Sequence, residues 1–433
     1  MVAPFRLDSL VPPAPPRVVP RGADPTPPPG RRRRRRRRLV VAVVIGAVVL
    51  ALVVTAAARL RAPDPVASVA AAMAATVPVA SAPVALPWAT AGQSAIAVPS
   101  VGVDVTSGPE QPVPIASLTK MMTAYVILRD HPLGPDQDGP RITMTQADVS
   151  DFDNDTVEDQ ANAQVTLGEV LTERQLLEGL LVHSANNFAD TLARWDAGDI
   201  PSFVAKMNST ATLLGMDHTH YADPSGFDQA SQSTAGDLLK VAAPDMSNPT
   251  FAAIVRQTSV TLPVAGTIST YTPLLGFQGV IGVKSGFTTA AGGCDVVAVV
   301  RDVHGIPALV LGAVTGQTGP NVLAKAGFIA LNLANHAATS VGMTQVVQAG
   351  QVVAHASAAG HTVPAVAVST IDVLSWPGVT ARQFFVAGRS VRAGTKAGTL
   401  IGSVLVTLGT QHVVTRVVLQ KHLPKPTMLQ RLW

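Results

Sequence analysis

Cysteine and charged residues are both scarce in this sequence. Cys294 is the single cysteine among 433 residues, which excludes an internal disulfide and a cysteine-based metal cage. Charged residues make up 14% of the chain and hydrophobic residues 47%, a balance that suits a globular protein with a membrane segment. The length is sufficient for two folded domains and additional segments.

The basic isoelectric point, about 9.4, misrepresents most of the chain. Residues 1–61 hold 13 Lys and Arg against 2 Asp and Glu, a net charge of +11, whereas the whole chain carries +4. The remaining residues are therefore acidic, with a net charge of −7. An acidic folded part does not favour a nucleic acid as a partner.

A segment rich in proline and arginine precedes an uninterrupted apolar stretch near the N-terminus. Residues 1–38 cannot build a core and are predicted to form a disordered cytoplasmic tail, which ends in eight consecutive arginines. Residues 39–58 carry no charge and match the length of a bilayer-spanning helix, which rises ~1.5 Å per residue. The arginine run on one side, against Arg59 and Arg61 on the other, predicts a cytoplasmic N-terminus.

A cleaved signal peptide is the alternative to a permanent anchor. The alanines at positions 56–58 offer a small-residue cleavage site. The apolar stretch is longer than the ~7–15 residues usual in a signal peptide, which favours an uncleaved anchor. In both cases we expect the following domains to work outside the cytoplasmic membrane, and the anchor makes the lipid bilayer a partner through residues 39–58.

Composition divides the rest of the chain into a linker and two domains. Residues 59–87 are rich in Ala, Pro and Val and are predicted to be a linker. Residues 88–335 mix short strands with helices, including one predicted over residues 166–181, in which Thr172 and Gln175 form a capping-box pattern. Residues 340–433 alternate Val, Ala, Thr and Gly in short runs, which predicts a small β-rich accessory domain without a grouping that suggests chemistry.

An acidic segment between residues 148 and 160 resembles the start of a calcium-binding loop. Asp151, Asp153 and Asp155 alternate as such a loop requires. The sixth position is Thr156 instead of Gly, and the twelfth is Asn162 instead of Glu. We therefore interpret the segment as a solvated loop.

Ser117 and Lys120 begin an apolar segment that runs to about residue 128 without Gly or Pro. This pattern predicts a buried helix whose first turn carries both side chains on one face, because residues three apart are neighbours on a helix. A helix N-terminus also offers free backbone N–H groups to an anion. The two residues could thus supply a nucleophile, a base and part of an anion site, although a serine cap beside a solvated lysine would have the same sequence.

Two further motifs follow in order along the chain. Ser184-x-Asn186 lies between two predicted helices, and Lys284-Ser285-Gly286 lies at the end of a predicted strand. Each of the three motifs occurs once in the sequence. Their order and wide spacing predict one site that is assembled from a helix start, an inter-helix loop and a strand.

The three motifs resemble the S-x-x-K, S-x-N and K-T/S-G set of penicillin-recognising serine acyl transferases. Within that group the chain resembles the low-molecular-weight penicillin-binding proteins, which are serine-type D-alanyl-D-alanine carboxypeptidases, over about residues 90–330. The residues around Ser117 and the segments 214–216, 223–226, 233–235 and 282–289 carry the resemblance. It implies an α+β fold, with an antiparallel sheet flanked by helices and an all-helical subdomain, followed by the small all-β domain.

The resemblance also implies a role for each motif residue. Ser117 would be the nucleophile that forms the acyl ester, and Lys120 would be its general base, kept neutral by burial and by the nearby Lys284. Ser184 would relay a proton to the leaving amine. Asn186 would orient the substrate and Lys120.

The third motif would bind the substrate's terminal carboxylate through Lys284, Ser285 and Gly286. Ser285 stands where Thr is usual and keeps the hydroxyl. The backbone N–H groups of Ser117 and Phe287 would form the oxyanion hole. The implied reaction trims the terminal D-alanine of a peptidoglycan stem pentapeptide at the bacterial cell membrane, with β-lactams as inhibitors and without a cofactor or a metal.

Several alternatives share these motifs. A transpeptidase, a DD-endopeptidase and a β-lactamase have the same fold, but a class A β-lactamase needs a deacylating Glu after Asn186, and none occurs between Asn187 and Asp223. From a different class, a catalytically silent, membrane-anchored peptidoglycan-binding protein would have no need of Lys120.

Three other side chains could suggest chemistry. His183 flanks Ser184, but adjacent residues seldom point at one another, so we expect a structural histidine. His218 and His220 alternate like metal ligands, but no third ligand accompanies them at the usual spacing. We therefore expect no metal site.

Overall fold

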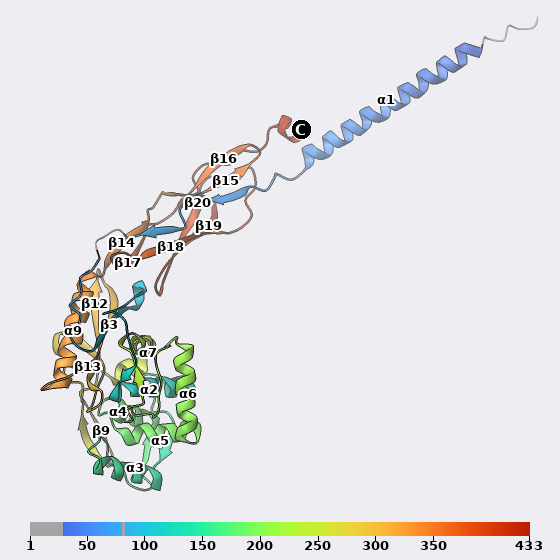
Figure 1. Ribbon diagram of the computed structural model, residues 1–433. Helices are drawn as coiled ribbons and strands as arrows, with labels where there is room; N and C mark the ends of the chain where they lie inside the picture. The colour runs from blue at the N-terminus through green and yellow to red at the C-terminus, as the bar shows by residue number, and fades with distance from the viewer. Residues whose placement is uncertain (1–28, 80–82) are drawn as a thin grey trace, which may run out of the picture. The chain divides into compact units, whose positions relative to one another are not determined.

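The computed structural model describes residues 29–79 and 83–433, which form two compact units (Figure 1). One unit contains residues 29–64 and 425–433, and the other contains residues 65–424. Residues 1–28, most of the predicted cytoplasmic tail, lie outside the described part.

The first unit consists of a long helix and a short one. Helix α1 (Pro29–Arg61) includes a stretch, Arg33–Arg61, that is long and apolar enough to cross a membrane, with a mean hydropathy of 3.1 in its most apolar window. A signal sequence near an N-terminus has the same character. Helix α10 (Met428–Leu432) begins at a capping box of Thr427 and Gln430, and Arg431 forms an ion pair with Asp64.

A five-stranded antiparallel sheet is the centre of an α+β domain, which we define as residues 83–341. The strand order is β11-β12-β13-β3-β4. Both faces of the sheet are buried, so alternate residues of its strands enter different cores: Val296 and Ala298 pack towards the helical subdomain, and Val297 and Val299 pack against α9. This explains why the strands are almost continuously apolar. Their bounds are β3 Gln93–Val98, β4 Val103–Thr106, β11 Val280–Thr288, β12 Gly292–Val303 and β13 Ile306–Gln317.

Helices cover the two faces of this sheet unequally. Helix α9 (Val322–Ser340) packs on one face through small residues such as Ala330 and Ala334. The other face is covered by a helical subdomain, whose helices contribute the apolar stripes that the sequence pattern predicts. The helices are α2 Thr119–Asp130, α3 Gln146–Val157, α4 Glu173–Leu181, α5 Asn186–Ala197, α6 Ile200–Leu213, α7 Ala235–Ser247 and α8 Pro249–Ile254.

Short elements complete the α+β domain. Three 3₁₀ turns (η1 Pro99–Val101, η2 Ala116–Leu118 and η3 Phe277–Gly279) connect its parts, and three two-stranded ladders pair β5 with β8, β6 with β7 and β9 with β10. The capping box of Thr172 and Gln175 is confirmed, but the helix predicted from residue 166 begins only after it, because residues 170–172 pair with β6 as strand β7. The bounds of the ladder strands are β5 Val113–Pro114, β6 Arg141–Thr143, β7 Val170–Thr172, β8 Gln232–Ser233, β9 Ser259–Leu262 and β10 Gly266–Ser269.

A second domain, which we call the β domain, consists of residues 342–424 and two strands from the N-terminal side. Its main sheet has the order β1-β15-β16-β20-β19-β18-β2, and β14 pairs with β17. The β-rich character predicted for this part of the chain agrees with the structure. The bounds are β14 Gly342–Val347, β15 Val352–Ala358, β16 His361–Ala367, β17 Ile371–Ser375, β18 Thr380–Ala387, β19 Leu400–Leu408 and β20 Gln411–Leu419.

The structure differs from the prediction that residues 59–87 are a linker. Strand β1 (Ser68–Ala71) pairs with β15, and β2 (Thr76–Pro78) pairs with β18. Val69 and Val77 pack against the core of the β domain. Each of the two strands is too short to show an alternation of apolar and polar residues in the sequence. They form because both edges of an existing sheet offer unpaired backbone groups.

The acidic segment is also not the predicted loop. Residues 146–157 form α3, which begins at a capping box of Thr145 and Asp148. Asp148 is buried and accepts hydrogen bonds from Thr191 (2.7 Å) and from Arg194 (2.8 Å) on α5. Partners that lie more than forty residues away in the sequence thus stabilise a helix in a segment whose composition predicts a loop.

Candidate active site

Ser117 lies in a tight turn that leads directly into helix α2. The 3₁₀ turn η2 precedes α2, and Ala116 adopts a left-handed backbone with φ of +50°. Such a conformation is uncommon for a residue with a Cβ, and it is typical of positions where a site dictates the backbone. Ser117 is only partly buried, so its hydroxyl can meet a molecule from solvent.

Lys120 is fully buried and contacts the serine hydroxyl directly. Its Nζ donates to Ser117 Oγ at 3.0 Å, to Asn186 Oδ1 at 2.5 Å and to the Ser225 carbonyl at 2.8 Å. A buried amine with three oxygen partners is held in one position. Ser117 and Lys120 are thus in contact as the sequence predicts, although Ser117 lies in η2 and not in the helix that contains Lys120.

Burial and a second cation lower the pKa of Lys120 to about 7. Burial is the larger cause because it disfavours the ammonium form, and the charge of Lys284 acts in the same direction. The carboxylates of Asp223, Asp155 and Asp190 oppose the shift. A substantial fraction of the amine is consequently neutral near neutral pH, which a general base requires.

Asn186 is the first residue of α5, and residues outside the helix accept hydrogen bonds from its backbone and its side chain. Its backbone N–H donates to the Ala161 carbonyl at 2.7 Å, and its side-chain amide donates to Gln160 Oε1. Ser184, two residues earlier, is buried and has a left-handed backbone with φ of +65°. The connection between α4 and α5 is thus the second position in the site where backbone strain occurs.

Lys284 and Ser285 lie on β11 and are both buried. Lys284 Nζ donates to the Ser285 carbonyl at 2.8 Å, and Ser285 Oγ donates to the Tyr271 carbonyl at 2.8 Å. Burial lowers the pKa of Lys284 to about 8, and the nearby Asp295 partly opposes this. A protonated Lys284 is available below that pH.

Gly286 allows β11 to pass directly beside the nucleophile. A Cβ on Gly286 would lie 2.8 Å from the backbone nitrogen of Ser117 and 3.2 Å from that of Leu118. Only glycine permits this approach of two backbones. The side chain of the next residue, Phe287, is 51% exposed.

Two groups in the site have no signal in the three motifs. Gln160, between α3 and β7, holds Asn186, and the carbonyl of Ser225 holds Lys120. Ser225 belongs to a turn in which Asp223 Oδ2 accepts the backbone N–H of Gly226 at 2.8 Å. The Asp-Pro-Ser-Gly sequence marks this turn, whereas nothing around Gln160 distinguishes it from a surface glutamine.

The turn requires glycine at position 226. Its φ is +82°, and a Cβ would lie 1.9 Å from the Ala116 carbonyl oxygen. The turn therefore packs against the residue that precedes the nucleophile. Its Ser225 carbonyl faces Lys120 because this packing brings the two segments together.

The remaining candidates show no catalytic arrangement. His183 Nδ1 lies 2.8 Å from the Ser269 carbonyl, and its ring stacks on Tyr271 with centroids 4.9 Å apart, which agrees with the predicted structural role. Burial raises the pKa of Cys294 to about 12, so its thiol is unreactive. Within residues 29–79 and 83–433, no cluster of three or more His, Cys, Asp or Glu side chains could hold a metal ion.

The fold and the arrangement of Ser117, Lys120 and Asn186 define the class of penicillin-binding serine peptidases. The family model described as D-alanyl-D-alanine carboxypeptidase matches residues 85–315, and this chain belongs to that family of serine peptidases. The family and the α+β fold predicted from the sequence are thereby confirmed.

Individual relatives resemble the chain over part of their length. It is 36% identical over 164 residues to D-alanyl-D-alanine carboxypeptidase DacB2 of Mycobacterium tuberculosis, covering 35% of this chain and 56% of the relative. It is 34% identical over 202 residues to the D-alanyl-D-alanine carboxypeptidase of Streptomyces sp. strain K15, covering 43% and 67%. Other relatives are named D-alanyl-D-alanine endopeptidases.

A solved structure shows the same fold. Penicillin-binding protein 5 of Haemophilus influenzae superposes with a TM-score of 0.56 at 19% identity, covering 79% of this chain and 100% of that protein. At this identity the likeness concerns the fold alone.

Proposed function

We propose that this chain is a D-alanyl-D-alanine carboxypeptidase that removes the terminal D-alanine of peptidoglycan stem peptides through an acyl-enzyme on Ser117. The observation that supports this most strongly is the contact of 3.0 Å between the buried Lys120 amine and the Ser117 hydroxyl. A serine hydroxyl is a weak nucleophile unless a base lies within hydrogen-bond reach.

The acylation step starts with proton transfer from Ser117 Oγ to the neutral amine of Lys120. The freed oxygen attacks the carbonyl carbon of the penultimate D-alanine, and the backbone N–H groups of Ser117 and Phe287 stabilise the negative oxygen of the tetrahedral intermediate. Ser184 relays the proton to the leaving amine, the C–N bond breaks and D-alanine departs. Water then hydrolyses the Ser117 ester and releases the shortened peptide.

The remaining motif residues position the substrate. Asn186, which holds Lys120 through its Oδ1, offers its amide to the peptide backbone. Lys284 and Ser285 bind the terminal carboxylate, which distinguishes a C-terminal D-alanine from an internal one. A β-lactam mimics the terminal dipeptide and leaves Ser117 blocked as a stable ester.

The apolar part of α1 supports a membrane location. We propose that residues 39–58 remain as an uncleaved anchor, with the N-terminus in the cytoplasm and the folded domains outside, because the eight arginines lie on one side only. A mass measurement of the chain isolated from membranes tests this, since cleavage near residue 58 would remove more than fifty residues.

The test of the reaction measures D-alanine release from a stem pentapeptide by the full-length chain in detergent. We expect release by the wild type and its loss in Ser117→Ala, together with loss of covalent labelling by a fluorescent penicillin. Release that persists in Ser117→Ala would overturn the assignment of the nucleophile. A wild type that neither releases D-alanine nor takes the label would be the silent binding protein instead.

An endopeptidase is the second candidate, because relatives of comparable similarity carry that name. The two activities use the same serine and differ in the bond that is cleaved. A cross-linked peptide dimer and a linear pentapeptide, offered to the same preparation, separate them. A carboxypeptidase cleaves the pentapeptide faster, and an endopeptidase cleaves the dimer faster.

A further inference from the structure

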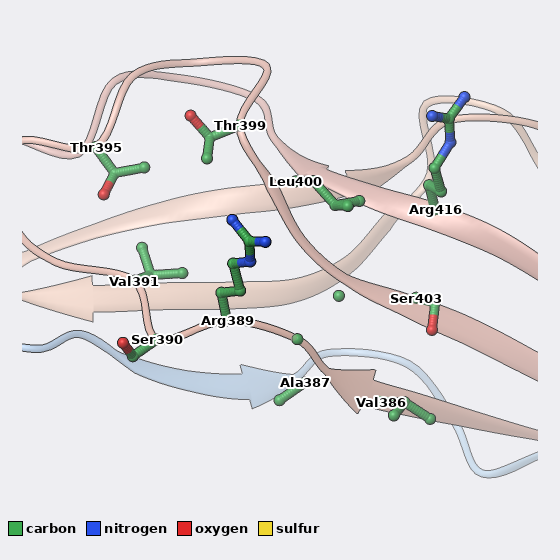
Figure 2. Close-up of a pocket in the computed structure, with 12 residues that line it drawn as sticks. Val386, Ala387, Arg389, Ser390, Val391, Thr395, Thr399, Leu400, Ser403 and Arg416 are labelled. Atoms are coloured by element: carbon green, nitrogen blue, oxygen red, sulfur yellow. The ribbon is translucent and has the colours of Figure 1, made fainter.

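The connection between β18 and β19 encloses a cavity of about 750 Å³ on the β domain (Figure 2). Arg389 lies in its centre, with the guanidinium directed towards Thr399 and Leu400, and Arg416 of β20 stands at the rim beyond Leu400. Four residues with hydroxyl groups also line the cavity, and no acidic residue is among the lining side chains. The hydroxyls belong to Ser390, Thr395, Thr399 and Ser403.

Neither arginine has an ion pair within the described part of the chain. The ion pairs there involve other residues, and the single acidic residue between positions 342 and 424 is Asp372, against six Lys and Arg. Arg389 and Arg416 therefore line one cavity, and the single acidic residue of residues 342–424 is not among its lining side chains. Cations that line a cavity without an acidic partner favour the binding of an anion.

The shape of the cavity indicates what kind of anion it suits. A guanidinium matches the oxygens of phosphate in pairs, and neighbouring hydroxyls add donors. The volume falls in the range of about 300–1,000 Å³ that is typical of small-molecule sites, so the ligand is larger than the anionic group alone. Val386, Val391 and Leu400 supply an apolar wall for the rest of it.

We propose that this cavity binds a phosphate ester, with the phosphate on Arg389 and the organic part against Leu400. A soluble glycerol or sugar phosphate and an anionic lipid headgroup share this chemistry. The site is independent of the peptidase activity, because it lies on the other domain of the chain.

The test titrates the full-length chain in detergent with glycerol 3-phosphate and, separately, with short-chain phosphatidylglycerol, because α1 would carry the chain into any vesicle whatever the cavity binds. We expect Arg389→Gln to weaken binding about tenfold, the loss of one charge-assisted contact. Arg382→Gln is the matched control, because Arg382 is exposed on the same β18 but does not line the cavity. D-alanine release should be the same in both variants.

The two ligand arms identify the source. Binding of glycerol 3-phosphate indicates a soluble ester, and binding of phosphatidylglycerol alone indicates a lipid headgroup. The proposal fails if neither probe binds, if acetate competes as well as phosphate, or if Arg382→Gln weakens binding as much as Arg389→Gln.

Discussion

The α+β domain and the β domain differ in the sign and the placement of their charges. Residues 83–341 carry 24 Asp and Glu against 11 Lys and Arg, whereas residues 342–424 carry one acidic residue against six basic ones. Lys120, Lys284 and Asp295 are completely buried in the first domain. The buried polar side chains of residues 342–424 are all uncharged, namely Ser375, Gln383 and Thr415.

This difference indicates what each domain is built to do. Burying a charge destabilises a fold unless the charge is compensated, so buried cations remain where a site needs a shifted pKa. The β domain has a core of Val, Ala and Leu, and its cations are at the surface. The buried charged groups are therefore concentrated in one domain, and the other exposes its cations to solvent.

The largest expected effect comes from removing the buried amine. Lys120→Met should lower the rate of acylation by a fluorescent penicillin about 10²–10⁴-fold, the usual contribution of a general base. Lys396→Met in the β domain is the matched control, because Lys396 is exposed, and it should leave the rate unchanged. Equal rates for wild type and Lys120→Met would show that the buried amine of the α+β domain contributes no more to acylation than an exposed amine of the β domain.

The second prediction concerns the approach of two backbones. Gly286→Ala places a Cβ 2.8 Å from the Ser117 nitrogen and should reduce acylation about 10²-fold by displacing an oxyanion donor. Gly342→Ala at the start of β14 meets no atom within 4 Å and should be silent. Far-UV circular dichroism of both variants should match the wild type, and a misfolded Gly286→Ala would invalidate the comparison of rates.

The dependence of acylation on pH follows from the two buried lysines. Lys120, with its pKa lowered to about 7, must be neutral, so the rate rises as the pH increases through 7. Lys284, with a pKa of about 8, must be protonated, so the rate falls as the pH increases above 8. The profile of kcat/KM should be a bell with its maximum between these values, changing about tenfold per unit outside it. A flat profile from pH 6 to 9 would contradict both roles.

The same shifts affect stability. Both lysines have a lower pKa in the folded state than the ordinary value of 10.5. At a pH between the lowered pKa and 10.5, the unfolded chain therefore binds more protons than the folded chain. Their contribution to the free energy of unfolding therefore increases as the pH rises from about 7 towards 10. The β domain has no such buried amine and contributes nothing of this kind.

The sequence predicts the residues of the site better than it predicts the secondary structure around them. Lys120 contacts both Ser117 and Asn186, and the sequence marks all three because each lies in a motif at the start of a helix. Gln160 escapes prediction because its role depends on Asn186, which meets it only after folding. The assigned roles of Ser184, Lys284 and Ser285 stay predictions until the variants are measured.

Prediction from the sequence fails for strands and helices that are stabilised by partners far away in the chain. Strands β1 and β2 are short and rich in alanine, and they exist because β15 and β18 offer free edges. Helix α3 has an acidic sequence that a pattern assigns to a loop, but Arg194 and Thr191 of α5 compensate Asp148. Local composition contains no information about either partner.

The smallest expected effect on catalysis comes from removing the β domain. A chain without residues 62–79 and 342–433 should keep penicillin acylation within about twofold of the wild type, because the core between the sheet and the helical subdomain contains no residue of the β domain. A chain that lacks residues 342–433 alone keeps β1 and β2 without their partners and should aggregate more in size-exclusion chromatography. Equal behaviour of the two chains would show that β1 and β2 tolerate separation from the sheet.

The participation of β1 and β2 in the β domain also determines the order in which the chain can fold during synthesis. Ser68 leaves the ribosome long before its partner Ser357, and Thr76 long before Arg382. The α+β domain is complete in the interval, so it can fold while the first two strands of the β domain still wait for their neighbours. The sheet of the β domain is therefore completed last, after the α+β domain has formed.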